Sequence, residues 1–505
     1  MQILPPETRL AVRRRPAALS EAVLDRADAA AFVIADHDPA KALAGLPYAA
    51  LWKALHRSAR RRGKSPLLVT RLPNARHTIA AVGFLPRGAS AYLRLELAGR
   101  LMRELLQPGV ISMQCHAAGF EDAEAPDVVE ALASAALAAA APMPQRKSRP
   151  VPPPDLKSID AHGVRAGDLE SAVGSAAGNH LARWLAALPP NELDCVTYRR
   201  ALATLARREG WTFRFYDERA LTRLGAGAFL AVSRANAHRG AGIVRLGYRP
   251  RGRRARHRVG LVGKGICFDT GGINIKSHKG MYQMHGDMQG SAVAVGTLLA
   301  LSRRRVPLEI DCWLALTENE IGPRAYRPQE VVRAMNGVTI QVVHSDAEGR
   351  MVLADALALA AREKPGLLMD FATLTGACVN ALTERYSGAF TTHDALASAV
   401  VEAGRASGER IWCFPMDEDF DAELDSPMAD VMQCTLDSKG DHILAARFLS
   451  RFVPSSVPWV HIDLSSSERK GGLAHVPTEF TGFGVRMAAT LLGEDDLFGR
   501  LEKPA

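Results

Sequence analysis

Apolar and polar positions follow two patterns along this chain, and together these patterns predict a succession of strands and helices. Continuous apolar runs at 30–36, 66–72 and 78–85 predict strands. Segments with an apolar residue every three to four positions, at 90–106 and 127–141, predict helices. Strands that alternate with helices are typical of an α/β domain, which we place at residues 1–141.

A proline-rich, basic segment interrupts this pattern. Residues 142–154 read PMPQRKSRPVPPP, a composition typical of a semi-rigid linker. We extend the linker over residues 142–165, because the next helical pattern begins near Gly167. The second domain is then expected to cover residues 166–505.

In the second domain the same two patterns predict a mostly parallel sheet flanked by helices. Strands are predicted at 212–216, 242–248, 258–263, 310–316, 338–343, 367–372, 412–416 and 459–465. Helices are predicted at 167–188, 197–210, 288–303, 351–363, 402–410 and 442–452. Polar residues gather after the predicted strand ends, where open α/β sheets place their ligands. The strand 258–263 is expected to end just before Lys264, and the strand 338–343 to lead to Asp346.

Charged residues in the stretch 263–350 are the strongest candidates for chemistry, because each lies next to a glycine or at the end of an apolar run. They are four acids and three bases: Asp269, Asp287, Asp346, Glu348, Lys264, Lys276 and Arg350. Four converging carboxylates repel each other unless cations neutralise them, and carboxylate oxygens suit Mg, Mn or Zn. Because one catalytic metal needs fewer carboxylates, the set predicts a two-metal site. In extended backbone Asp346, Glu348 and Arg350 would point the same way.

Four motifs in this region resemble the leucine (cytosol) aminopeptidases, which are two-metal exopeptidases. They are GKGICFDTGGINIK at 263–276, RAYRPQEVV at 324–332, SDAEGR at 345–350 and ATLTGA at 372–377. Their order and spacing match that family, and the resemblance is strongest over 189–485. It implies a metal-dependent enzyme that removes N-terminal residues from peptides.

The resemblance also implies a set of metal ligands. Asp269 and Glu348 would bridge two divalent ions, either Mn or Zn. Asp346 would complete the first site, and Lys264 and Asp287 would complete the second. A lysine ligand must be neutral, so the nearby cations would have to lower the pKa of Lys264 strongly.

The remaining implied roles concern catalysis and the substrate. Hydrolysis would use a metal-bound hydroxide and a gem-diolate intermediate, whose oxyanion Lys276 would stabilise. Arg350 would hold a bicarbonate ion that acts as the general base. The positions that match the family's substrate pocket are Met284, Thr373, Leu374 and Gly376. A methionine-lined pocket favours an apolar side chain such as leucine, although a narrow dipeptidase would share the same catalytic residues.

The chain departs from the family pattern near the site. His344 and Ser345 stand before Asp346, where relatives usually have Asn and Thr. Residues 437–443 (DSKGDHI) lack the glycine-rich run of many relatives, and residues 480–485 (FTGFGV) stand where a TGRP-like end is usual. Glu318 and Glu320 are unassigned acids that we expect to support the site or cap a helix.

The formal net charge of +9 raises a second function hypothesis, a DNA-binding or scaffolding protein that retains the peptidase fold. Basic clusters occur at 13–15, 57–64, 251–258 and 303–305. No aromatic residues interleave with them, so a solvated arginine-rich surface is favoured over nucleic-acid contact.

The cysteine content and the hydropathy of the chain indicate the cellular compartment in which we expect the protein. Seven cysteines without a CxxC pair indicate a reducing compartment, and no apolar stretch is long enough to span a bilayer. The N-terminus lacks the apolar core of a signal peptide, so we expect a cytoplasmic protein without membrane contact. The family resemblance further implies a homo-hexamer.

Overall fold

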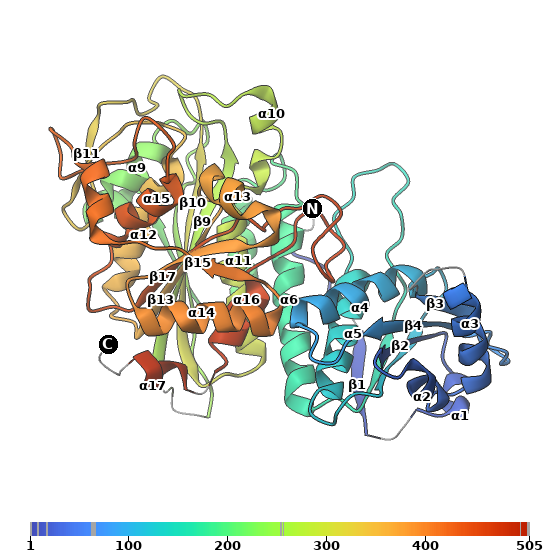
Figure 1. Cartoon of the computed structure of the whole chain (residues 1–505). Helices are drawn as coiled ribbons and strands as arrows, with labels where there is room; N and C mark the ends of the chain where they lie inside the picture. The colour runs from blue at the N-terminus through green and yellow to red at the C-terminus, as the bar shows by residue number, and fades with distance from the viewer. Residues whose placement is uncertain are drawn as a thin grey trace.

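A computed structural model describes residues 3–7, 10–16, 19–61, 67–252, 255, 257–494 and 496–501. It has two α/β lobes, and the long helix α6 (Ala166–Ala186) stands between them (Figure 1). The α/β class and the helix-flanked sheet predicted from the sequence are confirmed.

Six described strands form the sheet of the first lobe, in the order β1-β6-β5-β2-β4-β3. All neighbours are parallel except β3, which runs antiparallel to β4. The strands are β1 (Ala11–Arg15), β2 (Ala29–Ala35), β3 (Leu68–Arg71), β4 (Ile79–Leu85), β5 (Ser112–Ala118) and β6 (Ser158–His162). The helices are α1 (Glu21–Leu24), α2 (Pro39–Ala44), α3 (Ala49–Arg61), α4 (Ala91–Leu105) and α5 (Ala125–Ala140).

The central strand β2 is apolar throughout because helices cover both faces of this sheet. Its alternate residues Ala31 and Val33 join the core formed with α4 and α5. Phe32 and Ile34 point the other way and join the core formed with α1, α2 and α3. A strand buried on both faces reads as a continuous apolar run, which is the pattern that located it in the sequence.

Strand β6 lies within the range 142–165 that the sequence predicted to be linker. It pairs in parallel with both β1 and β5, so the first sheet reaches beyond residue 141. Its sequence SIDAH is too short and too mixed to stand out as a strand, and its partners are far away in the sequence.

The second lobe is built on a described sheet of eight strands, in the order β15-β14-β17-β13-β9-β10-β8-β7. The central strands β17, β13, β9 and β10 are parallel, and antiparallel pairings occur toward the edges. The strands are β7 (Thr212–Asp217), β8 (Gly242–Tyr248), β9 (His257–Asp269), β10 (Leu308–Asn319), β13 (Leu367–Ala372), β14 (Ser387–Phe390), β15 (Ile411–Cys413) and β17 (Trp459–Asp463).

Helices cover both faces of this sheet. One core contains residues of α6, α7, α11, α14, α16 and α17, and the other contains residues of α8, α9, α12 and α15. The helices are α7 (Cys195–Glu209), α8 (Glu218–Leu224), α9 (Gly227–Ser233), α10 (His278–Met281), α11 (Gln289–Arg303), α12 (Glu348–Ala361), α13 (Gly376–Leu382), α14 (Asp394–Ser407), α15 (Asp441–Ser450), α16 (Val485–Leu491) and α17 (Leu497–Leu501). The described residues also form short 3-10 helices at Met284–Gly286, Thr383–Arg385 and Glu418–Leu424.

Helix α6 crosses α11 at a pair of glycines. A Cβ atom added to Gly178 would lie 2.1 Å from the carbonyl oxygen of Gly296, and one added to Gly296 would lie 2.6 Å from that of Gly178. Only glycine permits this approach, so the sequence brings the two backbones into direct contact.

Two strand predictions differ from the structure near the site. β9 continues to Asp269, so Lys264 lies inside a strand and not in the loop after it. The strand predicted at 338–343 is shortened to β12 (Thr339–Gln341). It belongs to a separate small sheet with β11 (Val331–Arg333) and β16 (Val431–Met432), and not to the main sheet.

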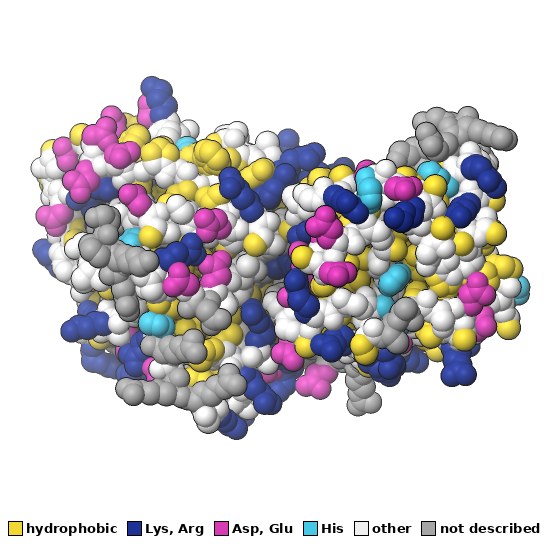
Figure 2. All heavy atoms as spheres, turned by 60° about the horizontal axis from the view of Figure 1, so that its bottom comes forward, with side chains coloured by type: hydrophobic (Ala, Val, Ile, Leu, Met, Phe, Trp, Pro, Cys, Tyr) yellow, Lys and Arg dark blue, Asp and Glu magenta, His cyan; other side chains and the backbone are white. Residues whose placement is uncertain are grey.

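The basic clusters are partly paired and partly outside the described residues. Residues 62–66, 253, 254 and 256 lie outside, while Arg303 pairs with Glu209 at 2.7 Å and Arg258 pairs with Glu309 at 3.2 Å. Figure 2 shows Lys and Arg scattered over both lobes with Asp and Glu among them. Among the described residues, no helix is long and apolar enough to span a bilayer.

Candidate active site

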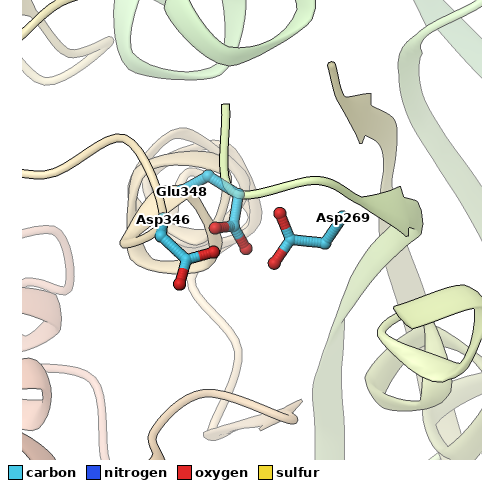
Figure 3. Close-up of side chains that lie close together, drawn as sticks. All are labelled: Asp269, Asp346 and Glu348. Carbon is cyan, nitrogen blue, oxygen red and sulfur yellow. The ribbon is translucent and has the colours of Figure 1, made fainter. Parts of the chain in front are cut away.

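The predicted metal ligands meet at the carboxyl ends of the central strands. Lys264 and Asp269 come from β9, Asp287 stands just before α11, and Glu348 is the first residue of α12. In Figure 3 the carboxylates of Asp269, Asp346 and Glu348 face a common point. Each of these three offers an oxygen within 4.8 Å of the other two.

The backbone at 346–350 is not extended, which corrects the sequence prediction for this segment. Glu348 and Arg350 lie in the first turn of α12, so their side chains point in different directions. Gly349 between them packs on Lys264, because a Cβ there would lie 2.6 Å from the Lys264 Cε. Because Gly349 has no side chain, the first turn of α12 can lie close against β9. This close approach brings the Glu348 carboxylate next to Lys264.

Two lysines pair with the carboxylates. The Nζ of Lys264 lies 2.8 Å from Asp287 Oδ1 and 3.1 Å from Glu348 Oε1. The Nζ of Lys276 lies 2.8 Å from Asp269 Oδ2 and 2.5 Å from Asp346 Oδ1. The carboxylates outnumber the ammonium groups, so the cluster keeps an excess of negative charge.

Burial and mutual repulsion perturb the protonation of this cluster. Burial, together with Asp269, raises the pKa of Glu348 to about 8, and burial raises the pKa of Asp287 to about 6. Burial alone would lower the pKa of Lys264, but the neighbouring carboxylates raise it above its usual range. Without metal ions Lys264 is therefore charged, and its use as a ligand would require it to lose a proton.

The chemistry of these residues fits divalent cations. Asp287 Oδ2 is buried and has no hydrogen-bond partner among the described residues, as expected of a ligand atom. Carboxylate oxygens with one amine nitrogen suit Mn and Zn. The site residues could therefore hold metal ions, and Lys276 lies at their edge with a side chain that is 17% exposed.

Asn319 is a central residue of the site that the sequence analysis missed. Its amide Nδ2 donates to Asp269 Oδ1 at 2.8 Å and to the Ser345 carbonyl at 3.0 Å, and it lies 3.4 Å from Glu348 Oε2. The parallel pairing of β9 with β10 sets Asn319 opposite Asp269. That register comes from pairing between segments far apart in the sequence, so the sequence alone provides no signal for Asn319.

The loop before Asp346 is also fixed by polar contacts. The Ser345 hydroxyl donates to the carbonyl of Gly271 at 2.7 Å, and it accepts from the backbone N–H of Asn274 at 2.8 Å. His344 Nδ1 accepts a 3.3 Å hydrogen bond from the Asp346 backbone N–H. These contacts tie the loop after β9 to the turn that carries Asp346.

A cavity of about 480 Å³ opens above the cluster. Its lining includes the five predicted metal ligands and Lys276, together with the predicted substrate positions Met284, Thr373, Leu374 and Gly376. Leu374 and Thr375 are held by Asp463, which accepts from the Leu374 N–H at 3.2 Å and the Thr375 hydroxyl at 2.6 Å. Asp463 thus shapes the cavity wall.

Arg350 is the one predicted site residue that is not among the described residues lining this cavity. Its Nη2 donates to both carboxylate oxygens of Asp441 at 2.8 Å, and its Nη1 donates to the Gln433 carbonyl at 3.1 Å. The guanidinium is therefore engaged within the chain.

Comparison with known families agrees with this geometry. A profile described as the cytosol aminopeptidase family, catalytic domain, matches residues 180–489. The chain belongs to the cytosol aminopeptidase family. Membership of this family is consistent with the acidic cluster at the cavity.

Curated relatives match the catalytic region. A probable cytosol aminopeptidase of Rhodopseudomonas palustris (strain BisB5) is 39% identical over 316 residues, which is 62% of each chain. One of Methylorubrum extorquens is 38% identical over 345 residues, 67% of this chain and 68% of the relative. The chain thus spans about 62% of the length of the Rhodopseudomonas relative.

Solved structures match nearly the whole chain. The bottromycin maturation enzyme BotP in complex with Mn has a TM-score of 0.79 and 29% identity, covering 92% of this chain and 99% of that one. A mutant of tomato leucine aminopeptidase has a TM-score of 0.83 and 26% identity, covering 97% of this chain and 98% of that one.

Proposed function

We propose that this protein is a metal-dependent aminopeptidase that releases N-terminal, preferably apolar, residues from peptides. The observation that carries the proposal is the cavity whose lining includes the cluster of four carboxylates and two lysines. Mn in the BotP complex supports Mn at this site, and the donor set suits Zn equally.

The residues around the cavity have separate tasks in this reaction. Divalent ions would supply Lewis-acid chemistry and activate water. The free α-amine of a peptide's N-terminus is a nitrogen ligand of the kind that such ions accept, so recognition of that group would make the enzyme an exopeptidase. Lys276 keeps its proton, because Asp269 and the other carboxylates raise its pKa against the effect of burial. It is therefore placed to stabilise negative charge that develops on the scissile carbonyl oxygen.

Apolar residues in the cavity lining support a preference for leucine-like side chains. Met284, Leu374, Val379 and Leu464 line the cavity. A narrow dipeptidase would differ only in how far the cavity accepts the rest of the peptide. Rates on Leu-Gly and on longer leucine peptides would separate the two.

The direct test is hydrolysis of leucine p-nitroanilide by chelator-stripped protein after addition of Mn, Zn, Mg or Co singly. We expect metal-restored activity that Asp269→Ala abolishes. Asp437→Ala, an exposed residue away from the cavity, is the control and should behave like the wild type. No hydrolysis of any leucine substrate by folded, metal-loaded protein would refute the proposal.

Assembly and partners rest on the family resemblance. We propose that the protein is cytoplasmic and assembles as a homo-hexamer. Light scattering of the purified protein would test the hexamer. Nucleic-acid binding is less favoured, because described arginines of the basic clusters pair with acids. A DNA duplex whose mobility is unchanged at low salt would remove that alternative.

A further inference from the structure

Arg350 is a buried cation beside the metal ligands. It lies in the first turn of α12, two residues after Glu348, and is 2% exposed. A buried guanidinium without a negative partner is strongly unfavourable. The residue therefore requires either a carboxylate from the chain or an anion from solution.

Asp441 supplies that negative charge. Both of its oxygens lie 2.8 Å from Arg350 Nη2, and the pair bridges α12 and the first residue of α15. An acidic residue in the first turn of a helix is also favoured by the helix dipole, which stabilises Asp441 in this position. Nη1 donates to the Gln433 carbonyl at 3.1 Å, and Nε is buried without a hydrogen-bond partner among the described residues.

Gln433 connects this pair to the ligand loop. Its side chain accepts from the backbone N–H groups of Val343 and His344, each at 3.0 Å, and donates to the Ala347 carbonyl at 3.0 Å. Arg350 thus holds the residue that fixes the loop carrying Asp346. Arg350 and Asp441 act as positioning residues, because neither belongs to the described lining of the cavity.

The family resemblance implied a bicarbonate ion at Arg350, and this geometry does not fit one. The segment 437–443, where the chain departs from the family's glycine-rich run, places the Asp441 carboxylate on the guanidinium to which the resemblance assigns the anion. We propose that Asp441 takes the place of an exogenous anion at Arg350, so that this enzyme works without bicarbonate. The inference rests on the proposed function for its activity assay alone.

The activity test compares variants of Asp441 in CO2-free buffer, with bicarbonate or chloride added at equal ionic strength and pH. Metal-loaded wild type should hydrolyse leucine p-nitroanilide equally in both. Asp441→Ala removes the charge and opens space, so its rate should fall by roughly tenfold or more and recover severalfold with bicarbonate or formate. Asp441→Asn fills the same space without charge, so its lowered rate should not recover. Asp437→Ala should match the wild type throughout.

A second readout does not need activity. Bicarbonate should raise the Tm of Asp441→Ala, with or without metal, and leave the Tm of the wild type and of Asp441→Asn unchanged. Activation or stabilisation of the wild type by bicarbonate overturns the inference. So does an Asp441→Ala variant whose rate and Tm do not respond to bicarbonate. Wild type that is inactive with every metal would refute the proposed function, while the Tm comparison would still decide the inference.

Discussion

At the residue scale, the carboxylates of this site are oriented by a neutral neighbour as well as by the two lysines. Asn319 is 1% exposed and joins Asp269, Ser345 and Glu348 through a single amide group. Metal ligands are oriented by such outer contacts, which set how well the site is formed before the ions bind.

We predict that Asn319→Ala weakens metal binding. Removing the amide leaves Asp269 Oδ1 and the Ser345 carbonyl without this donor, so metal affinity should fall by about 10- to 100-fold. Calorimetric titration of chelator-stripped protein with Mn measures the change. Asn380→Ala, on the exposed side of α13, is the control. Equal affinity in both variants would show that Asn319 does not orient the ligands.

A second residue-scale prediction concerns pH. Below about pH 6 Asp287 and Glu348 both hold protons, and above about pH 8 both are ionised. Metal ions compete with these protons and with that of Lys264, so affinity should rise between pH 6 and 8 and protons should be released on binding. Titrations in buffers of different ionisation enthalpy count those protons. Affinity that is flat across this range would contradict the assignment of these ligands.

The ligand set could be predicted from the sequence because its motifs are local, whereas the partners of the ligands could not. Glu318 and Glu320 were the acids expected to support the site. Alternate residues of a strand face opposite sides, and Asn319 between them is the one that faces the carboxylates. Glu320 instead accepts from the backbone N–H of Ala237.

At the element scale, strand ends and helix starts were the least predictable features. β9 extends to Asp269 because β10 pairs with it over nearly its full length, and such distant pairing leaves no local signal. The helix α12 begins at Glu348, whose negative charge suits a helix N-terminus. The sequence pattern predicts that this helix begins at Met351, because the periodic apolar residues begin only there.

The contact between α6 and α11 gives an element-scale prediction. Gly178→Ala places a methyl group against the Gly296 backbone, so it should destabilise the fold by about 1–3 kcal/mol. Gly167→Ala, in the same helix with nothing within 4 Å of the added Cβ, should be neutral or slightly stabilising. Urea unfolding of the two variants measures both effects. Equal urea midpoints for the two variants would contradict the prediction, because they would show that the contact between α6 and α11 tolerates the added methyl group.

At the scale of the whole molecule, a partly buried ion pair joins the two lobes. Arg486 of α16 donates to both carboxylate oxygens of Glu130 in α5 at 2.8 Å, and Ser134 donates to the same carboxylate. The side chains of Arg486 and Glu130 are 15% and 13% exposed, so water screens their attraction only weakly. No local pattern in the sequence indicates this pair, because its members are 356 positions apart.

We predict that Glu130→Gln destabilises the protein in a pH-dependent way. Burial alone would raise the pKa of Glu130, but Arg486 lowers it below its ordinary value of 4.5. The pair therefore stabilises the fold above that value and ceases to do so as pH falls through the lowered pKa.

At neutral pH the variant should lose about 3 kcal/mol, because Arg486 keeps its charge without this partner. The difference from the wild type should shrink in acid. Glu121→Gln, which disrupts an exposed pair with Arg87, is the control and should change stability by less than about 0.5 kcal/mol. Calorimetric Tm values across pH test the prediction, and a difference between Glu130→Gln and wild type that grows in acid would mean that Glu130 is not ionised in the folded protein.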